Sequence, residues 1–300
     1  MDETSGNTAD NIGSLGSAAD ATFFGAYSQG AASLVSDGVA AVNFSNGRVS
    51  PGNVNGVNLA GPFAARTIEL WFRATAVSGR QVLFEQGGGT RGLNIYLDNA
   101  VLYVGAWNRS NDDGGGGAAA WGQPKIVHVS ASAAIQANRT YHVVLVMAGD
   151  SSGTNGTLTG YLNGTPFGSV GGVGLLCDHN PAVVGEAHNG VRFHQGASAN
   201  NTEFAGDIDE VAIYDAVLSP TRIAAHYAAG QTGPVAHYAF DETAGTTARD
   251  SSPSGLDGAY AGGVALATPG PYPRAGAVAA GLDGVDDHID LPNVNFNYST

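Results

Sequence analysis

Two acids at alternate positions of one apolar run are the residues whose types and spacing most directly offer chemistry. Asp207 and Asp209 lie in residues 204–214, which read Phe-Ala-Gly-Asp-Ile-Asp-Glu-Val-Ala-Ile-Tyr. Alternate residues of a β-strand share a face, so both carboxylates would lie beside Val211 and Ile213. If that face is core, the two acids are at its rim, where an unpaired charge is costly.

These carboxylates have two interpretations. One is a calcium site, because calcium binds carboxylate and carbonyl oxygens; Asp207 and Asp209 would then be joined by Asp2 or Asp241 and by backbone carbonyls. The other is that each carboxylate accepts hydrogen bonds from loop amides, which would satisfy it without a metal. The first interpretation predicts a structural calcium ion, and the second predicts none.

A glycine-rich loop between two tryptophans is the second candidate site. Residues 107–121 hold Trp107, Asp112, Asp113, four consecutive glycines and Trp121. The indoles could form a platform for a sugar ring, with the two carboxylates accepting hydrogen bonds from hydroxyl groups or holding an ion. The alternative is a mobile hairpin with both indoles packed at its base.

Three histidines cluster in the sequence near the only cysteine. His179, His188 and His194 follow Cys177 within 17 residues. Zinc favours such ligands, but this spacing fits no common zinc motif, and loop histidines are usually solvated. One cysteine also excludes an intrachain disulfide.

Composition excludes several partners. The 300 residues include 12 Lys and Arg against 26 Asp and Glu, a net charge of −14. This charge disfavours nucleic acids and anionic membrane surfaces, and no apolar stretch is long enough for a membrane-spanning helix. Low charge content with abundant neutral polar residues suits an extracellular or cell-surface protein. Residues 1–6 resemble no signal peptide, so either the chain stays inside the cell or it is an excerpt from a longer secreted polypeptide, and an internal repeat leads us to expect the excerpt.

The elements that must position these residues are mostly strands. Residues 67–73 alternate apolar and polar side chains, which predicts a half-exposed antiparallel strand. Further short runs follow at 81–85, 93–97, 101–106, 125–130, 141–147 and 158–162, and Asn163-Gly164 is a strong hairpin signal. Ser219 and Pro220 begin one short capping helix near 219–229. The pattern predicts an all-β protein, a two-sheet antiparallel sandwich.

The chain also contains a repeat. Residues 1–9 match residues 240–248 at Asp2, Glu3, Thr4, Gly6, Thr8 and Ala9. We therefore expect one nearly complete module at 1–232 and the opening segment of a second at 233–300. The second begins with an apolar strand, Val235–Phe240, that the first lacks.

These motifs resemble the laminin G-like jelly roll of the concanavalin A-like lectin/glucanase superfamily. Residues 204–214 followed by a short helix resemble its closing signature, 237–252 its opening strand and loop, and 284–290 its second strand. The resemblance implies a two-sheet jelly roll, secretion, glycan or protein ligands and often a structural calcium ion. Residues 46–49 depart from it, because they lack the acids found at Asp286 and Asp287, and this weakens an ion site there.

Three functions compete. We favour a non-catalytic adhesion or carbohydrate-binding module from a repetitive secreted or surface protein, with a glycan or cell-surface ligand. A second hypothesis is a self-assembling filament subunit, in which residues 235–240 insert into a neighbouring copy by donor-strand complementation. A glycoside hydrolase is the third. Superfamily glycosidases carry Glu, Asp and Glu at alternate positions of a strand, whereas here the position after Asp207 and Asp209 is Val211, so we expect no enzyme.

Overall fold

The computed structural model describes all residues except 1, 2, 4, 37, 38, 110–119, 122, 154, 189, 197, 200, 201, 232–235, 251–255, 271–277 and 293–300. It divides into two compact units. The first consists of residues 1–34 and 39–228, and the second of residues 35–38 and 229–300. The sequence repeat placed this boundary between 232 and 233.

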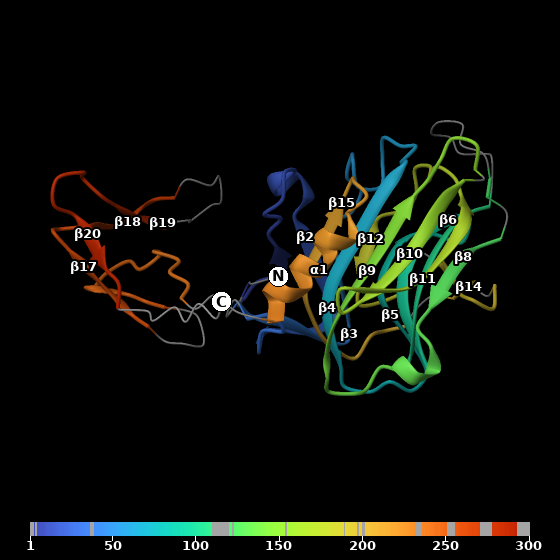
Figure 1. Cartoon of the computed structure of the whole chain (residues 1–300), viewed down its shortest axis with the longest axis horizontal. Coiled ribbons are helices and arrows are strands. Elements are labelled where there is room, and N and C mark those ends of the chain that lie inside the picture. Colours follow the sequence, from blue (N-terminus) through green and yellow to red (C-terminus); the bar gives the residue numbers. More distant parts are fainter. Residues whose placement is uncertain are drawn as a thin grey trace, which may run out of the picture. The chain divides into compact units, whose positions relative to one another are not determined.

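Antiparallel strands build the first unit (Figure 1). Thirteen of the described strands form one continuous hydrogen-bonded sheet, in the order β11-β10-β9-β4-β15-β3-β12-β5-β6-β7-β8, with β2 on β3 and β1 on β2. They are β1 (Thr8–Ala9), β2 (Ala21–Ala31), β3 (Ala41–Ser50), β4 (Ala65–Ala74), β5 (Arg80–Gly87), β6 (Arg91–Asp98), β7 (Val101–Asn108), β8 (Lys125–His128), β9 (Thr140–Ala148), β10 (Gly156–Leu162), β11 (Thr165–Val173), β12 (Ala182–Val184) and β15 (Gly206–Tyr214). Short elements η1 (Gly16–Ala19), η2 (Ala131–Ala133), β13 (Val191–Arg192) and β14 (Ser198–Ala199) complete the unit.

The sheet folds over on itself to make two layers. β3 pairs with β15 through residues 42–44 and with β12 through Val49, so it passes from one layer to the other. β8, at one end of the strand order, packs against β10 and β11, at the other end. The apolar side chains between the layers form one continuous core. This is a two-layer antiparallel jelly roll, and the predicted all-β sandwich is confirmed.

The strands of the central region are buried on both faces. Val143, Leu145 and Met147 of β9 point into the core between the layers, whereas Val144 and Val146 join a second apolar cluster on the outer face. β4 behaves similarly, and Trp71 on its outer face is only 3 % exposed. Residues 67–73 therefore form the predicted strand, but the prediction that it is half-exposed was wrong because a helix covers its outer face.

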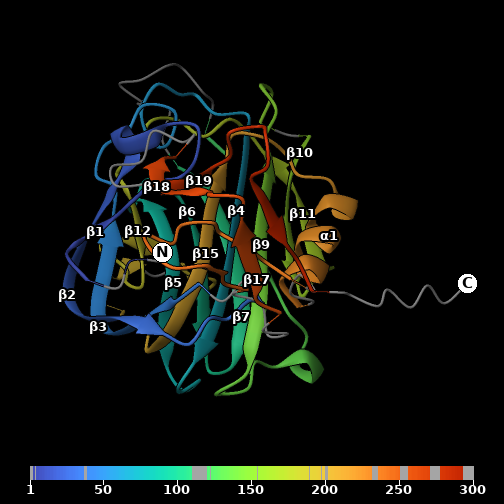
Figure 2. The same ribbon diagram turned by 90° about the vertical axis from the view of Figure 1, so that its left-hand side faces the viewer.

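That cover is α1 (Pro220–Gln231), the one α-helix among the described residues, which closely matches the predicted 219–229. Its first turn is capped as expected, since the backbone N–H of Arg222 donates to Ser219 Oγ over 3.2 Å. Ile223 is fully buried against Val144, Val146 and neighbouring side chains of the outer cluster. Figure 2 shows α1 and the β1–β3 strands at opposite sides of the first unit.

Among the described residues, no helix combines the length and the apolar character that crossing a bilayer requires.

The second unit contains five described strands. β16 (Thr247–Ala248), β17 (Gly258–Ala261) and β20 (His288–Asp290) form one antiparallel sheet, and β18 (Ala265–Pro269) pairs with β19 (Val278–Gly281). Of the expected strand 235–240, residue 235 lies outside the described residues. Residues 236–240 make a single antiparallel bridge, between Tyr238 and Asp250, rather than a ladder.

The sequence repeat is also a structural repeat. The backbone N–H of Asp10 donates to Glu3 Oε1 over 2.7 Å, and that of Arg249 donates to Glu242 Oε1 over the same distance. The backbone bond from Phe23 to Asn7 recurs from Tyr260 to Thr246, at 2.9 Å in both. β16, β17 and β20 are therefore paired as β1, β2 and β3 are.

The buried contact of Ile223 gives a direct test of how α1 is held. Ile223→Ala leaves a cavity under the helix, and we expect it to lower the free energy of unfolding by about 2–4 kcal/mol. Val217→Ala, at a side chain that is 50 % exposed just before the helix, is the matched control and should change it by less than about 0.5 kcal/mol. Urea unfolding measures both; equal effects would contradict the packing described.

Candidate functional site

The carboxylate of Asp207 is fully engaged by protein side chains. Arg73 donates from Nε and Nη2 to Asp207 Oδ2, over 2.9 and 2.7 Å. Asn43 Nδ2 donates to the other oxygen, Oδ1, over 2.7 Å. These three residues lie side by side on neighbouring strands, since Asp207 is opposite both Arg73 and Asn43. Asp207 therefore ties β15 to the strands on either side of it.

Asp209 lies two residues further along β15 and is 1 % exposed. Its Oδ2 accepts the backbone N–H of Leu34 over 2.9 Å, and its Oδ1 accepts that of Glu210 over 3.1 Å. The ladder of β15 on β4 is interrupted here, and Glu210 has a φ of 47°. These contacts are those of the alternative in which the carboxylate is satisfied by loop amides.

The residues predicted to bind calcium are Asp207 and Asp209, joined by Asp2 or Asp241. Asp207 and Asp209 belong to the first unit and Asp241 to the second, while Asp2 lies outside the described residues. The calcium site stays a prediction.

An acidic cluster occurs instead in the second unit. Asp283, Asp286 and Asp287 each have an oxygen within 4.8 Å of the others. Part of this cluster is engaged locally, because Asp283 Oδ1 accepts the N–H of Val285 and Asp287 Oδ2 accepts the N–H of Asp283. The N–H of Val285, together with neighbouring backbone N–H groups, lowers the pKa of Asp283.

Both tryptophans of the glycine-rich loop are buried. Trp107 is fully buried and its Nε1–H donates to the carbonyl of Gly88 over 2.7 Å. Trp121 is 6 % exposed and donates to the carbonyl of Leu175 over 2.9 Å. Neither indole offers an open face for a sugar, so their burial fits the alternative in which they pack at the base of the loop. Asp112 and Asp113 lie outside the described residues.

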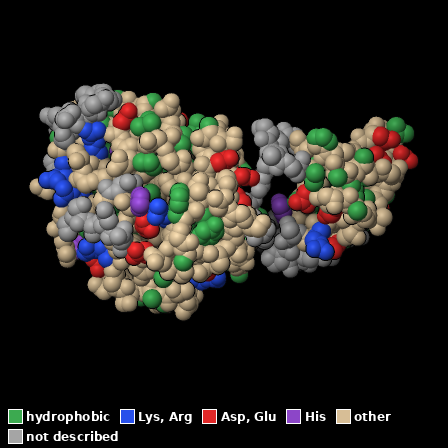
Figure 3. Space-filling view, turned by 180° about the vertical axis from the view of Figure 1, so that it is seen from behind, with side chains coloured by type: hydrophobic (Ala, Val, Ile, Leu, Met, Phe, Trp, Pro, Cys, Tyr) green, Lys and Arg blue, Asp and Glu red, His purple; other side chains and the backbone are tan. Residues whose placement is uncertain are grey.

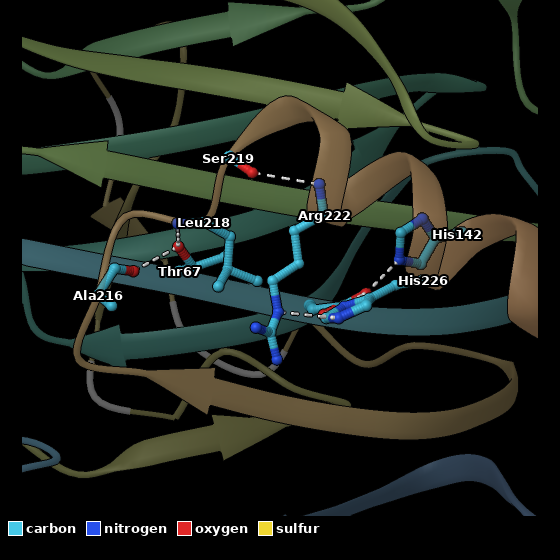
Figure 4. Close-up of polar contacts among 8 residues, drawn as sticks. Thr67, His142, Ala216, Leu218, Ser219, Arg222 and His226 are labelled. Atoms are coloured by element: carbon cyan, nitrogen blue, oxygen red, sulfur yellow. Dashed lines mark hydrogen bonds and ion pairs between the residues drawn. The ribbon is translucent and has the colours of Figure 1, made fainter.

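A buried cluster that the sequence analysis did not identify joins α1 to the sheet (Figure 4). Glu69 of β4, 5 % exposed, accepts a hydrogen bond from His142 of β9 over 2.7 Å. His226 of α1 donates from Nδ1 to both Glu69 oxygens, over 3.1 and 3.0 Å. Arg222 Nε donates to Nε2 of the same imidazole over 3.3 Å, which places the His226 proton on Nδ1. The helix is thus held by polar contacts as well as by Ile223.

The electrostatics of this cluster favour an ionised Glu69. Burial alone would raise the pKa of Glu69, but the hydrogen bonds from His142 and His226 outweigh it, and the pKa is lowered. Burial and the neighbouring Glu69 carboxylate raise the pKa of Tyr214 to about 12, so this phenol stays protonated. The stacked ring of Tyr227 lies 5.6 Å from that of Trp71 and encloses the cluster. The role of the Glu69 cluster is to hold α1 on the sheet.

An exposed aromatic surface lies on the other layer. We call it the Tyr103 surface; it consists of Tyr103, His128, His194, Arg80 and Asp98. The ring of Tyr103 stacks on the imidazole of His194, with centroids 4.4 Å apart and planes at 8°, and His128 lies 5.3 Å away. Both histidines are exposed, and Tyr103 is half-buried. The Arg80–Asp98 ion pair borders these rings.

Two buried side chains underneath hold this surface in place. The hydroxyl of Tyr96 accepts the backbone N–H of His194 over 2.9 Å and contacts His194 Nδ1 at 3.1 Å. Phe193 is fully buried against the outer face of β5–β7, and the guanidinium of Arg80 lies 4.3 Å above its ring. Burial lowers the pKa of His194, and Arg80 and His128 act in the same direction against Asp98. His194 is therefore a neutral, stacking imidazole at pH 7.

The arrangement offers the chemistry by which proteins bind sugars. Aromatic faces pack against the C–H groups of a pyranose, and a bordering carboxylate and guanidinium bond its hydroxyl groups. The sequence analysis considered His194 only as a zinc ligand and did not identify Tyr103. The alternation of side chains within residues 101–106 could have indicated that Tyr103 faces outward. No signal within residues 191–196 indicates that this segment packs over β6.

The fold and its closing strand define a lectin-like jelly roll. A family model described as the concanavalin A-like lectin/glucanases superfamily, of laminin G type, matches residues 50–224, more than half of the chain. The chain belongs to this family. The match does not extend to residues 233–300, so the predicted resemblance of that segment to a second module stays a prediction.

Solved structures show distant similarity. A native heptameric SAP-like pentraxin from Limulus polyphemus is 15 % identical, with 62 % of this chain and 84 % of that chain covered and a TM-score of 0.42. The CBM40 of the Ruminococcus gnavus IT-sialidase, bound to α2,3-sialyllactose, is 20 % identical, with 55 % and 83 % covered and a TM-score of 0.39. A search of curated proteins gives no match.

The Glu69 cluster predicts a defined pH dependence. Glu69→Gln replaces an acceptor by an NH2 group that faces N–H donors, so we expect a loss of about 1–3 kcal/mol in the free energy of unfolding at pH 7. Because the folded-state pKa of Glu69 is lowered, its stabilisation is present above its unfolded pKa, about 4.3, and is lost as pH falls through the folded value. The difference between wild type and variant should therefore shrink between about pH 5 and pH 3.

Urea unfolding at each pH measures this difference. Glu203→Gln is the control, because no side-chain hydrogen bond of Glu203 occurs among the described residues, and it should give a small, pH-independent change. A Glu69→Gln effect that stays constant down to pH 3 would contradict an ionised, hydrogen-bonded Glu69.

Proposed function

We propose that this protein is a non-catalytic carbohydrate-binding module that holds a glycan on the Tyr103 surface. The observation that carries the proposal is the exposed stack of Tyr103 and His194 beside the Arg80–Asp98 ion pair. Membership of the lectin-like family supports a glycan ligand. The rings lie on β7 and on a segment anchored by Phe193, so the surface is preformed rather than assembled by the ligand.

Adhesion at the cell surface or outside the cell is the setting we propose. Charged side chains are sparse on the face shown in Figure 3, and neutral groups cover most of it. This agrees with a charged content of 13 %. A surface of this kind presents few competing charges to a ligand made largely of hydroxyl groups.

The glycosidase alternative has little support from the described carboxylates. A retaining mechanism needs two carboxyl groups facing the substrate about 5–5.5 Å apart. Asp207 is paired with Arg73, Asp209 is buried against backbone amides, and Glu69 lies under α1. Absence of reducing-sugar release from β-glucans would agree with a binding module, and release would contradict it.

The filament alternative also has less support than glycan binding. Donor-strand complementation requires residues 235–240 to be available to a neighbouring copy. Within the described part of this segment, Tyr238 already bridges to Asp250, and its hydroxyl donates to the carbonyl of Leu256. Loss of monomer stability on deletion of 233–300 would revive the alternative.

Removal of the exposed rings tests the proposed function. Tyr103→Ala and His194→Ala each delete one ring of the stack, and we expect each to weaken glycan binding roughly tenfold. Affinity electrophoresis through gels that contain neutral or acidic polysaccharides measures the effect.

Phe24→Ala is the control for the loss of an exposed aromatic ring. Phe24 lies on β2, is 41 % exposed and is not part of the Tyr103 surface. It should leave retention unchanged. Thermal unfolding verifies that each variant is folded. Full retention of both Tyr103→Ala and His194→Ala, or no retention of the wild type on any polysaccharide, would contradict the proposal.

Calcium is a separate part of the proposal. If an ion is bound as the family resemblance predicts, a chelator should lower the midpoint of thermal unfolding and added calcium should restore it. An unchanged midpoint would argue against the ion without affecting the Tyr103 surface.

A further inference from the structure

We infer that the glycan carries carboxylate groups, which are bound by the paired guanidinium groups of Arg109 and Arg192. This inference rests on the proposed function, because it assigns a ligand class to the glycan held at the Tyr103 surface. It adds a second site, at the turn between β5 and β6, that none of the sequence motifs indicated.

One turn brings the two arginines together. The side chain of Arg192 crosses to residues 87–91, where its Nε donates to the carbonyl of Gly89 over 2.8 Å. The backbone N–H of Arg109 donates to the carbonyl of Thr90, the next residue, over 2.9 Å. The Trp107 indole, which bonds the carbonyl of Gly88, supports the same turn from below. The Arg192 guanidinium and the Arg109 backbone are therefore held at adjacent residues of one turn.

The charges of Arg109 and Arg192 are not balanced by a carboxylate among the described residues. Arg48, Arg73 and Arg80 each form an ion pair with a carboxylate. Arg109 and Arg192 form none with any described residue. Burial and the positive charge of Arg109 lower the pKa of Arg192, which agrees with two like charges close together. Two like charges with no carboxylate partner among the described residues would be stabilised by an anion.

A carboxylate is the anion that best fits this arrangement. Two N–H groups of a guanidinium match the two oxygens of a carboxylate, so an arginine pair can hold one such group from two sides. Nε and Nη1 of Arg192 donate to the carbonyls of Gly89 and Gly196, whereas no described residue accepts from Nη2. Nη2 is therefore the atom that can donate to a ligand.

The same segment connects the arginine pair to the Tyr103 surface. Asn94 and Tyr96 of β6 bond the carbonyl of Arg192 and the N–H of His194 over 2.8 and 2.9 Å. Arg192 and His194 alternate with the buried Val191 and Phe193, so both lie on the outer side of the segment. A polysaccharide that lies on His194 therefore follows a path toward Arg192, and repeated acidic sugars would place a carboxylate there.

A matched pair of polysaccharides tests the ligand class. Polygalacturonate and its carboxyl-reduced form differ only in the charged group. We expect the wild-type chain to bind polygalacturonate at least about tenfold more tightly than the reduced form, and this preference should fall as salt rises. Arg109→Gln and Arg192→Gln should each remove most of the preference, because each deletes one guanidinium group of the pair. Because the Arg192 guanidinium also bonds the carbonyls of Gly89 and Gly196, the Arg192→Gln result counts only if thermal unfolding shows an intact fold.

Arg139→Gln is the control for a general loss of charge. Arg139 is exposed and its guanidinium bonds only Gln136 among the described residues. It should keep the full preference. Arg109→Gln is the decisive variant because the Arg109 side chain holds no described hydrogen bond, so the fold should be unaffected; thermal unfolding verifies this.

The outcomes separate the inference from the proposed function. Equal wild-type affinity for both polysaccharides, or an equal loss of preference in Arg139→Gln, would overturn the inference and leave the Tyr103 surface as a neutral glycan site. If the wild type binds neither polysaccharide, the inference is overturned. If it also binds no other polysaccharide, the proposed function fails as well.

Discussion

Burial of both outer faces of the jelly roll is the constraint on which the first unit depends. α1 covers β4 and β9 on one layer, and Ala187, Val191 and Phe193 cover β5–β7 on the other. A buried polar group without a partner costs about 1–3 kcal/mol, so a cover that supplies a hydrogen-bond partner to a polar side chain beneath it is stabilised there. Glu69 is satisfied by His226 of α1, and Asn94 by the carbonyl of Arg192. Polar contacts therefore fix where each cover lies.

The same constraint explains how a covering segment contributes His194 and Arg192 to the candidate sites. Residues 191–194 are extended, so alternate side chains point to opposite sides. Val191 and Phe193 are buried against the sheet and anchor the segment. Arg192 and His194 must then point outward, where a ligand can reach them. The apolar residues that hold the segment thus also determine which functional groups are presented.

The sequence predicted elements from local signals and failed where partners are distant along the chain. Residues 67–73 and the helix after Ser219 have their signals within a few positions, and both form as expected. Hydrogen bonding to loop amides was one of the two interpretations of Asp209, but the sequence could not identify the donor, which is the N–H of Leu34, 175 residues away. Glu69 and His226 are 157 residues apart.

Exposure was the property least accessible from the sequence. Trp71 lies on the polar face of its strand pattern, yet α1 covers it, and Ala187, Val191 and Phe193 cover the Trp107 indole. The Tyr103 surface needs side chains from β5, β6, β7, β8 and a loop that follows them by about 60 residues. The sequence analysis considered His194 because of the histidines near it in sequence, whereas its proposed role depends on Tyr103, which is near it in space.

The repeat separates what local sequence determines from what the opposing layer determines. β17 pairs with β20 as β2 pairs with β3, so that Tyr260 and Ile289 occupy the positions of Phe23 and Val49. Phe23 and Val49 are 4 % and 3 % exposed because the other layer packs on them, whereas Tyr260 and Ile289 are only half-buried. Strand pairing follows from the repeated residues themselves. Burial of these side chains depends on strands such as β15, which the repeated segment does not contain. The opening segment therefore buries its apolar side chains only where the closing strand is present.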